Sequence, residues 1–287
     1  MVREVLQQLD LAENLTIVDG TVGGGGHSSE ILKQMPTGCR LIGLDRDPAM
    51  LARAAQQVSG EAAELHQASY AELDRVLDQL EIQQIDRVLL DLGLSSDQLA
   101  DADRGFGFET AGRLDMRFDP TTGTAAADLL AEADQDAIAK VFADYGEEPR
   151  AADLARAIVH RRQSGHPVQT ADELKALIEQ IIPTRKGKSH PATRLFQALR
   201  IAVNRELEQL ETFLDDVLPR RMAAGGRALI ITFHSLEDRL VKEAFRKVDT
   251  WDTLTRKPIT ATPSEVRWNP RSRSAKLRVA RRREENE

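Results

Sequence analysis

The sequence has a single cysteine, Cys39, among its 287 residues. One cysteine excludes an internal disulfide and a cysteine-based zinc site, and it is typical of a protein in the reducing cytoplasm. No charge-free apolar run reaches the roughly 18 residues that a membrane span needs. Residues 1–15 also lack the apolar segment of a secretory signal peptide. These absences favour a cytoplasmic protein, and 41% hydrophobic residues are enough for a substantial core.

The charge is acidic overall, with a formal net charge of −7, but it is unevenly distributed. Two windows contain no acidic residue and together carry fourteen positive charges, which leaves −21 on the rest of the chain. An acidic body with two basic stretches suits a polyanion such as RNA that is held on one face. The alternative is ordinary solvated surface, and salt-dependent RNA binding separates the two. The basic residues are Arg185, Lys186, Lys188, Arg194, Arg200 and Arg205 in the first window, and Arg267, Arg271, Arg273, Lys276, Arg278, Arg281, Arg282 and Arg283 in the second.

Three apolar, strand-like runs in the first hundred residues each finish in an aspartate. They cover 15–18, 40–44 and 87–90, and they are followed by Asp19, Asp45 and Asp91. Because these runs alternate with helical stretches, they predict βαβ units and a parallel sheet. In open α/β sheets the ligand lies beyond the carboxyl ends of the strands. The repeated aspartate is therefore the first indication of a functional site.

The rest of the chain predicts a helical insert within this α/β domain. We expect a weaker strand at 64–67, a central strand at 227–233 and a terminal edge strand at 277–280. From about 100 to 205 helical spacing replaces the strand pattern. Thr170 and Glu173 form a capping-box signature for a helix that ends before Pro183, and a second helix from Pro191 is expected to continue to Pro219. The expected domains are 1–100 with 206–287, and the insert 101–205.

A glycine-rich loop, residues 19–28, follows the first strand and precedes a helix expected to start near Ser28 or Ser29. Four consecutive glycines let the backbone approach a ligand closely. Asp45 follows the last glycine by nineteen residues, close to the ~20-residue interval at which an acid meets a ribose diol. The nicotinamide fingerprint fits less well, because Ser29 stands at its third glycine. S-adenosylmethionine needs no pyrophosphate cradle, so it is favoured over a dinucleotide and over a plain turn with a surface aspartate.

Ten short motifs occur in order along nearly the whole chain. They are DGT(19–21), GHS(26–28), LDRDP(44–48), LDLGLSSDQL(90–99), RGF(104–106), LDMR(114–117), YGEE(145–148), HPATR(190–194), FHSLEDR(233–239) and NPR(269–271). Together they resemble the bacterial ribosomal small-subunit RNA cytosine-N4 methyltransferase family. The resemblance implies a Rossmann-like class I methyltransferase sheet with a helical insert, S-adenosylmethionine as cofactor, and methylation of N4 of one cytidine in the decoding region. The partner would be small-subunit ribosomal RNA or the subunit itself.

The resemblance also implies which residues bind the cofactor. Gly25, Gly26 and His27 would contact the methionine end and Asp45 the ribose. Tyr70 would lie beside the adenine, and Asp91 and Gln98 would complete the pocket. Taken alone, Tyr70 is equally compatible with a core or boundary position, and His27 with a hydrogen bond to the loop backbone. Asp91 is the least surprising candidate, because buried acids rarely lack a partner.

Methyl transfer from a sulfonium is an in-line displacement that needs no metal, so alignment and charge placement supply most of the rate. The proline-containing tetrad of many amino-methyltransferases is absent after the 87–90 strand, where the chain reads Asp91-Leu92-Gly93-Leu94. We hypothesise that Asp91 or the following carbonyls accept hydrogens from the target amine. Asp115 or His234 would assist, although His234 is equally well explained as a hydrogen-bonded loop histidine.

The basic windows predict contacts to RNA phosphates around an unstacked target nucleotide. Arg185, Lys186 and Lys188 lie in a glycine-containing loop of the insert, together with Arg194 in the HPATR motif. Arg271 and Arg273 would contribute from the other side. A non-catalytic RNA-binding or ribosome-assembly factor is the alternative from another class, a nicotinamide oxidoreductase ranks third, and a DNA amino-methyltransferase is disfavoured by the motifs.

The chain departs from the family pattern at two places. Family members have a short histidine-containing segment before the stretch equivalent to residues 2–6, so we expect the N-terminal edge of the substrate site to be missing or the start to be misassigned. Arg113 stands where the family commonly has proline, which changes the expected loop shape before Leu114.

Overall fold

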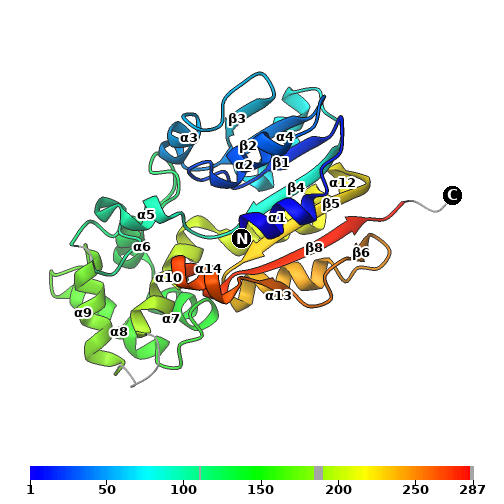
Figure 1. Cartoon of the computed structure of the whole chain (residues 1–287). Helices are drawn as coiled ribbons and strands as arrows, with labels where there is room; N and C mark the ends of the chain where they lie inside the picture. The colour runs from blue at the N-terminus through cyan, green and yellow to red at the C-terminus, as the bar shows by residue number, and fades with distance from the viewer. Residues whose placement is uncertain (110, 184–189, 285–287) are drawn as a thin grey trace. The chain divides into compact units, whose positions relative to one another are not determined.

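The computed structural model describes residues 1–109, 111–183 and 190–284, and it divides into two compact units (Figure 1). The sheet unit comprises Met1–Gly93 and Leu207–Glu287, and the helical unit comprises Leu94–Glu206. Each unit has its own hydrophobic core. The helical unit contains the segment 101–205 that the sequence analysis assigns to an RNA-binding insert. Arg185, Lys186 and Lys188 lie outside the described residues.

The sheet unit is built on one mostly parallel sheet, which confirms the expected Rossmann-like α/β fold. The strand order is β3-β2-β1-β4-β5-β8-β6, with β7 also paired to β8. The first five strands of this order are parallel, and β8 runs antiparallel to β5. The strands are β1 (Thr16–Asp19), β2 (Arg40–Asp45), β3 (Ala63–Gln67), β4 (Ile85–Asp91), β5 (Met222–Thr232), β6 (Trp251–Thr253), β7 (Ile259–Thr260) and β8 (Lys276–Arg282).

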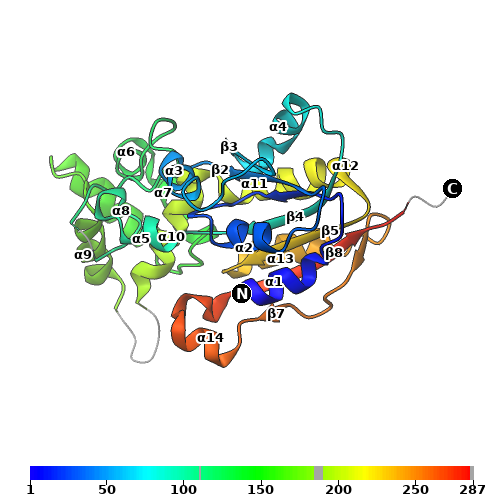
Figure 2. The same cartoon turned by 45° about the horizontal axis from the view of Figure 1, so that its top comes forward.

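Alternate side chains of each strand point to opposite faces of the sheet, and both faces are buried. In β4, Val88 and Leu90 belong to one core cluster and Leu89 to the other. Leu89 shares its cluster with α1 (Val2–Leu9) and α2 (Gly26–Gln34), which lie on the same side of the sheet (Figure 2). The opposite cluster is completed by α4 (Leu73–Gln79), α11 (Glu206–Thr212), the π-helical segment Phe213–Val217, α12 (Leu218–Arg221) and α13 (Ser235–Ala244).

A strand, β8, forms where one was expected at 277–280. It lies inside the sheet, however, so the prediction that it is an edge strand was wrong. The strand pairs with β5 on one side, and with β6 and β7 as well. These partners are only three and two residues long. Strands this short carry no recognisable alternation of apolar and polar residues, so the sequence pattern did not reveal the cover on β8.

The helical unit has a core of its own, and it contains the two helices that the sequence spacing predicts individually, after Thr170 and from Pro191. Thr170 is the N-cap of α9 (Ala171–Ile181), and its backbone N–H donates to the Glu173 carboxylate at 3.3 Å, as the capping box predicts. The helix ends two residues before Pro183. The other helices are α5 (Ser96–Ala100), α6 (Ala126–Glu132), α7 (Gln135–Asp144), α8 (Ala151–Gln163) and α10 (Pro191–Asn204).

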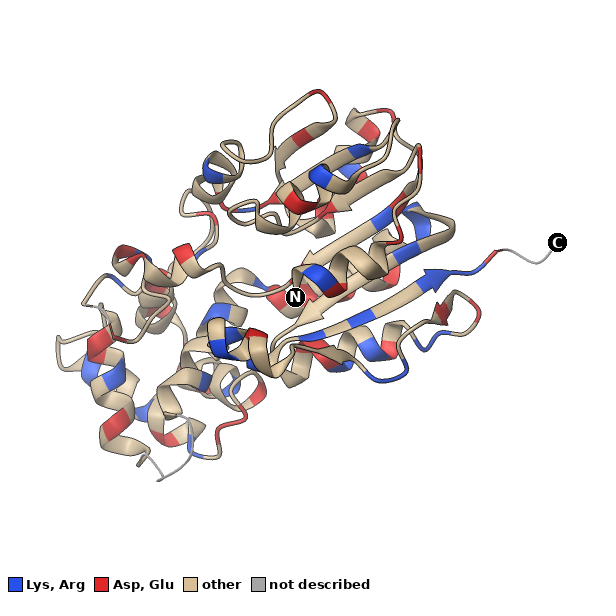
Figure 3. Ribbon diagram, viewed as in Figure 1, with Lys and Arg blue, Asp and Glu red and all other residues tan. Residues whose placement is uncertain are grey.

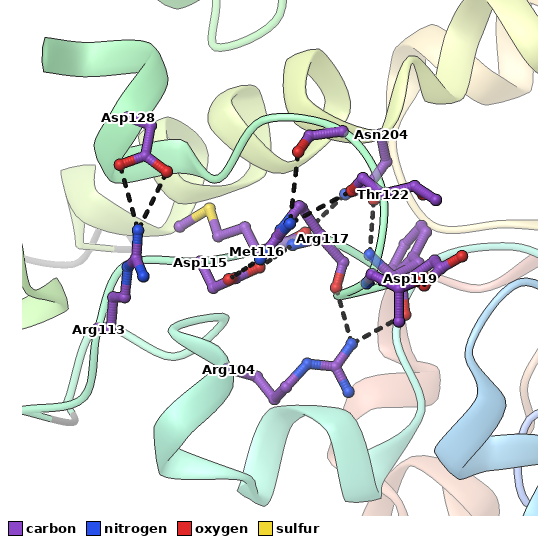
Figure 4. A network of polar contacts seen from close by, with 12 residues as sticks. Arg104, Arg113, Asp115, Met116, Arg117, Asp119, Thr122, Asp128 and Asn204 are labelled. Atoms are coloured by element: carbon purple, nitrogen blue, oxygen red, sulfur yellow. Dashed lines mark hydrogen bonds and ion pairs between the residues drawn. The ribbon is translucent and has the colours of Figure 1, made fainter.

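The expected continuous helix from Pro191 to Pro219 was wrong, because the chain breaks at Arg205. Arg205 adopts a left-handed conformation with φ 51°, between the last residue of α10 and the first of α11. The preceding Asn204 is buried, and its side-chain amide donates to the Met116 carbonyl at 2.7 Å and accepts from the Phe118 N–H at 2.8 Å (Figure 4). This side chain fixes the end of α10, and a periodicity of apolar residues cannot report it.

None of the helices in the described ranges combines the length and the apolar character of a membrane span.

Candidate active site

Three aspartates stand at the carboxyl ends of three adjacent strands, because β1 lies between β2 and β4. Asp19 is the last residue of β1 and is in register with Gly43 of β2 and Leu89 of β4. Asp45 and Asp91 each lie two residues farther along their own strands than the residues paired with Asp19. The sheet order thus brings to one edge the acids that the sequence placed at three separate strand ends.

Asp19 is the most deeply buried of the three, with 1% of its surface exposed. Its Oδ2 accepts a hydrogen bond from Ser28 Oγ at 2.5 Å, and its Oδ1 accepts from the Thr21 N–H at 3.2 Å. Burial raises the pKa of Asp19 above its ordinary value. The strand-end pattern marks Asp19 as it marks Asp45 and Asp91, but no role for Asp19 or Ser28 was predicted from the sequence.

The glycine loop turns directly into α2, whose first residue is Gly26, two or three residues earlier than expected. Gly25 has φ 91°, and a Cβ there would lie 3.1 Å from Val58 and 3.3 Å from Ala54. At Gly26 the situation is the opposite, because a Cβ would meet no heavy atom within 4 Å. Gly25 is therefore required by backbone conformation and packing, whereas Gly26 leaves open space beside the loop.

Asp45 links the second strand to the glycine loop. Its Oδ2 accepts a hydrogen bond from the Gly23 N–H at 2.8 Å, and its Oδ1 accepts from the Asp47 N–H at 2.9 Å. Burial raises the pKa of Asp45 to about 6, against the opposing effect of these two hydrogen bonds. A carboxylate has about four acceptor positions, so two remain for ligand hydroxyls.

His27 and Asp91 face each other, with His27 Nε2 3.4 Å from Asp91 Oδ2. Burial disfavours the charged imidazole, but the hydrogen bond and charge of Asp91 outweigh burial and raise the pKa of His27. The Asp91 N–H donates to Thr21 Oγ1 at 2.6 Å, which fixes the strand end against the loop. The other carboxylate oxygen, Oδ1, is shielded from solvent and has no hydrogen-bond partner among the described residues. An acceptor in this state is unfavourable unless a ligand or a water molecule supplies a donor.

Tyr70 lies at the same edge, in the short 3₁₀ turn Tyr70–Glu72 that follows β3. A Cβ on Gly20 would be 3.1 Å from Tyr70 Cβ, so the tyrosine packs against the start of the glycine loop. Its half-buried ring meets Phe213 edge-on, with 5.5 Å between the ring centroids. The position suits both a partner for adenine and a boundary residue of the core.

His234 is the N-cap of α13 and is held by that helix. Its backbone N–H donates to Glu237 Oε2 at 3.3 Å, and its Nε2 lies 2.9 Å from Glu237 Oε1. Glu237 is itself buried, with 2% exposure. These contacts favour the interpretation of His234 as a hydrogen-bonded capping residue, so its assistance in catalysis stays a prediction.

Asp115 and Gln98 belong to the helical unit, and their part in the site also stays a prediction. Arg117 donates to both oxygens of Asp115, at 2.9 and 2.7 Å (Figure 4). Burial acts to raise the pKa of Asp115, but the hydrogen bonds from Arg117 outweigh it and lower that pKa. Gln98 caps α5, where its Oε1 accepts from the Ser95 N–H at 3.0 Å. Arg113, in the loop before Asp115, pairs with Asp128 of α6 at 3.0 Å.

Residues 1–283 match the family model described as the MraW methylase family. The chain belongs to the MraW methylase family. This confirms the resemblance drawn from the sequence motifs. A ribosomal RNA small subunit methyltransferase H of Sorangium cellulosum is 45% identical over 282 residues, which cover 98% of this chain and 89% of the relative. The protein of the same name from Thermotoga neapolitana is 44% identical over 286 residues, with 98% and 94% covered.

Among solved structures, an rRNA methylase from Streptococcus thermophilus aligns over 99% of this chain and 94% of its own, with a TM-score of 0.43 and 12% sequence identity.

Proposed function

We propose that this member of the family is an S-adenosylmethionine-dependent methyltransferase that methylates N4 of one cytidine in the decoding region of small-subunit ribosomal RNA. The relatives' names support the reaction class and the RNA. The observation that carries the proposal in this chain is the buried Oδ1 of Asp91 at the glycine-loop edge, which has no hydrogen-bond partner among the described residues. It is an acceptor that requires a donor, and both the cofactor's ammonium and a target amine are donors.

The residues at this edge fit the cofactor. The open space beside Gly26 leaves room for its amino-acid portion, and His27 and Asp91 border the loop there. Asp45 keeps acceptor capacity for the two ribose hydroxyls, and Tyr70 packs beside the loop in a position suited to the adenine. When bound, the cofactor supplies an activated methyl group on its sulfonium. The chain's own contribution is to hold that group in place and to accept hydrogens from the attacking amine.

Charge favours this cofactor over a nicotinamide dinucleotide. S-adenosylmethionine carries a positive sulfonium and a positive ammonium, whereas a dinucleotide brings a negative pyrophosphate. Asp19, Asp45 and Asp91 all contact the loop between Gly20 and Ser28 through hydrogen bonds or its histidine. Carboxylates in a partly buried setting attract a cation and repel a pyrophosphate. The three carboxylates thus disfavour binding of a nicotinamide dinucleotide, and with it the oxidoreductase alternative.

For the transfer itself, Asp91 is the candidate that the geometry supports best. The N4 amine of cytosine is conjugated with its ring, so an acceptor for its hydrogens helps the nitrogen to become tetrahedral as it attacks. Asp91 Oδ1 is available for this role or for the cofactor's ammonium, whereas both oxygens of Asp115 already accept from Arg117 and His234 is held as the N-cap of α13. We therefore propose Asp91 as the principal acceptor, with Asp115 and His234 in assisting roles.

The pKa of about 6 for Asp45 predicts that cofactor affinity depends on pH. Above pH 6 the carboxylate is charged and accepts both ribose hydroxyls, and below pH 6 it is protonated and loses that capacity. We expect the Kd to rise about tenfold between pH 7.5 and pH 5. Calorimetric titrations across this range measure the change. An Asp45→Asn variant that kept the same dependence between pH 5 and 6 would assign it to another group.

The helical unit and the basic segments are proposed to bind the RNA around the target cytidine. Arg194 reaches Glu148 at 3.1 Å, and Arg271 and Arg273 are exposed in the 3₁₀ turn Pro270–Ser274 of the sheet unit. Both arrangements leave guanidinium groups at the surface, where phosphate oxygens are their natural ligands.

Reversing Arg185, Lys186 and Lys188 to glutamate should weaken RNA binding at least about tenfold and leave cofactor affinity unchanged, because three phosphate contacts become repulsive. Filter binding at two salt concentrations gives the RNA affinity, and calorimetry gives the cofactor affinity. A matched control reverses Lys33, Arg75 and Lys247, which carry the same charge but pair with nearby acids in the sheet unit. Equal RNA affinity of the two triple variants would contradict the assignment.

The proposal is tested by methyl transfer to ribosomal RNA. The purified chain, labelled cofactor and small-subunit RNA from cells that lack this gene should give label in one cytidine, and mass spectrometry of nuclease fragments identifies the base and the atom. Binding of RNA without any transfer of label would instead favour the non-catalytic RNA-binding or ribosome-assembly factor.

A further inference from the structure

Trp268 is the most exposed large hydrophobic side chain among the described residues. It is the last residue of α14 (Pro263–Trp268), and 89% of its surface is accessible. The other tryptophan, Trp251, is 2% exposed and lies in the sheet core. A large aromatic side chain gains much free energy when it is covered, so one that is this exposed is typical of a binding surface.

Two arginines close to Trp268 in the chain carry positive charge that no described residue neutralises. Arg267 and Arg273 are exposed and have neither a hydrogen bond nor an ion pair within the described part of the chain. Glu265 is the single acidic residue between 254 and 283. Guanidinium groups in this state are available to an anionic ligand.

The five cations of the same basic window within residues 276–283 already have partners. Arg282 donates to the Thr250 carbonyl at 3.2 Å, and the other four pair with acidic residues. Lys276 and Arg278 bind Asp238, at 3.2 and 2.7 Å, and Arg281 and Arg283 bind Asp252, at 3.0 and 2.7 Å. Figure 3 shows the basic positions continuing along β8, where acidic residues of the neighbouring elements compensate them. Within the described residues, Arg267 and Arg273 are therefore the cations of this window that have neither a hydrogen bond nor an ion pair, and Trp268 lies between them in the chain.

The segment that carries Trp268 is held in a defined conformation. Thr262 Oγ1 accepts the Glu265 N–H at 3.2 Å and caps α14 at its start. After the tryptophan, Ser272 is buried, and its hydroxyl donates to the Asn269 carbonyl at 2.7 Å. Pro270 restricts the backbone between them. The indole and the arginines are thus presented from a fixed turn, which reduces the entropy lost when a ligand binds.

We propose that Trp268 is a stacking platform for an unpaired base of the RNA substrate, and that Arg267 and Arg273 bind the phosphates on either side of that base. Single-stranded nucleic acid is bound by this combination of an exposed aromatic ring and adjacent cations, because every base has a π-face and every linkage a negative charge. An acidic protein surface would match only the arginines, and an apolar protein surface would match only the indole. The identity of the ligand as RNA rests on the proposed function.

The test compares Trp268→Ala, Trp268→Phe and a control, Val248→Ala, which truncates another exposed apolar side chain of the sheet unit, 64% accessible. Fluorescence anisotropy measures their affinity for a labelled, single-stranded segment of small-subunit ribosomal RNA. We expect Trp268→Ala to raise the Kd about tenfold, and Trp268→Phe to stay within about threefold because it keeps an aromatic face. Val248→Ala should match the wild type, and cofactor affinity should be equal in all four proteins.

Intrinsic fluorescence gives a second readout that does not depend on folding of the alanine variant. RNA should quench the exposed indole of the wild type and protect it from acrylamide, whereas the emission of Trp268→Phe, which comes from the buried Trp251, should not respond. Unchanged RNA affinity of Trp268→Ala, or a change in its oligomeric mass without a change in RNA affinity, would overturn the proposal in favour of a protein contact.

The outcomes separate this inference from the proposed function. If the wild type transfers methyl groups to RNA and Trp268→Ala binds RNA equally well, only the stacking platform is wrong. If the wild type binds the RNA through Trp268 but transfers nothing, the platform stands and the catalytic proposal fails. If the wild type binds no RNA at all, both are wrong.

Discussion

Asp91→Asn is expected to lower kcat/KM for RNA methylation at least about a hundredfold while the protein stays folded. Asparagine has nearly the same shape, so the packing at the end of β4 and the backbone hydrogen bond to Thr21 are kept. The change removes the negative acceptor whose Oδ1 has no partner among the described residues, and it weakens the pairing with His27. Loss of a single group that acts on developing charge in the transition state has costs of this size.

Separate measurements of the cofactor Kd and of kcat distinguish two roles of Asp91, binding the cofactor and accepting from the target amine. A higher cofactor Kd assigns the carboxylate to the ammonium of the cofactor, whereas a lower kcat at unchanged Kd assigns it to the target amine. Asp86→Asn is the matched control, because Asp86 lies at the opposite end of the same strand and binds the Thr16 N–H. It should keep full activity. An Asp91→Asn enzyme with wild-type kcat/KM would remove Asp91 from the mechanism.

Gly26→Ala is expected to separate stability from cofactor binding. Gly26 is the first residue of α2, and a methyl group there meets no protein atom within 4 Å. Alanine restricts the unfolded chain and is tolerated by the helix, so the free energy of unfolding should be unchanged or higher by about 0.4–1 kcal/mol. The same methyl group occupies the space proposed for the cofactor, so the Kd should rise at least about tenfold.

Thermal unfolding and calorimetric titration of the same samples measure both effects. Lys33→Ala, an exposed change on the same helix, should alter neither quantity. Gly25→Ala should behave differently from Gly26→Ala and lose stability, because its φ of 91° and the contacts to Ala54 and Val58 oppose any side chain. Cofactor binding by Gly26→Ala that equals the wild type would place the cofactor away from this loop.

Local patterns were sufficient to predict the strands that carry the site. The runs before Asp19, Asp45 and Asp91 form β1, β2 and β4, and the run after residue 226 forms the end of β5. Buried parallel strands are continuous apolar segments, so they are visible in a single stretch of sequence. The break at Arg205 and the interior position of β8 depend on a left-handed residue and on two very short partner strands, and neither leaves a periodic signal.

The contacts within the site could be predicted only in part. The spacing from the glycines to Asp45 is a property of one βαβ unit, so sequence distance reports it. The pair His27–Asp91 joins residues 64 positions apart, and it depends on the order of strands in the sheet. A single stretch of sequence also does not show which of its side chains are exposed. Trp268 and the paired arginines of β8 share one basic window, yet only the fold determines which cations are neutralised.

The most direct measurement of the central claim is a calorimetric titration of the purified chain with S-adenosylmethionine and, separately, with a nicotinamide dinucleotide. The strand-end site has three carboxylates, and one of their oxygens has no hydrogen-bond partner in the part of the chain that the structure describes. Such a site predicts stoichiometric binding of the sulfonium compound and no heat from the dinucleotide. Binding of the dinucleotide, or no binding of S-adenosylmethionine, would contradict the account.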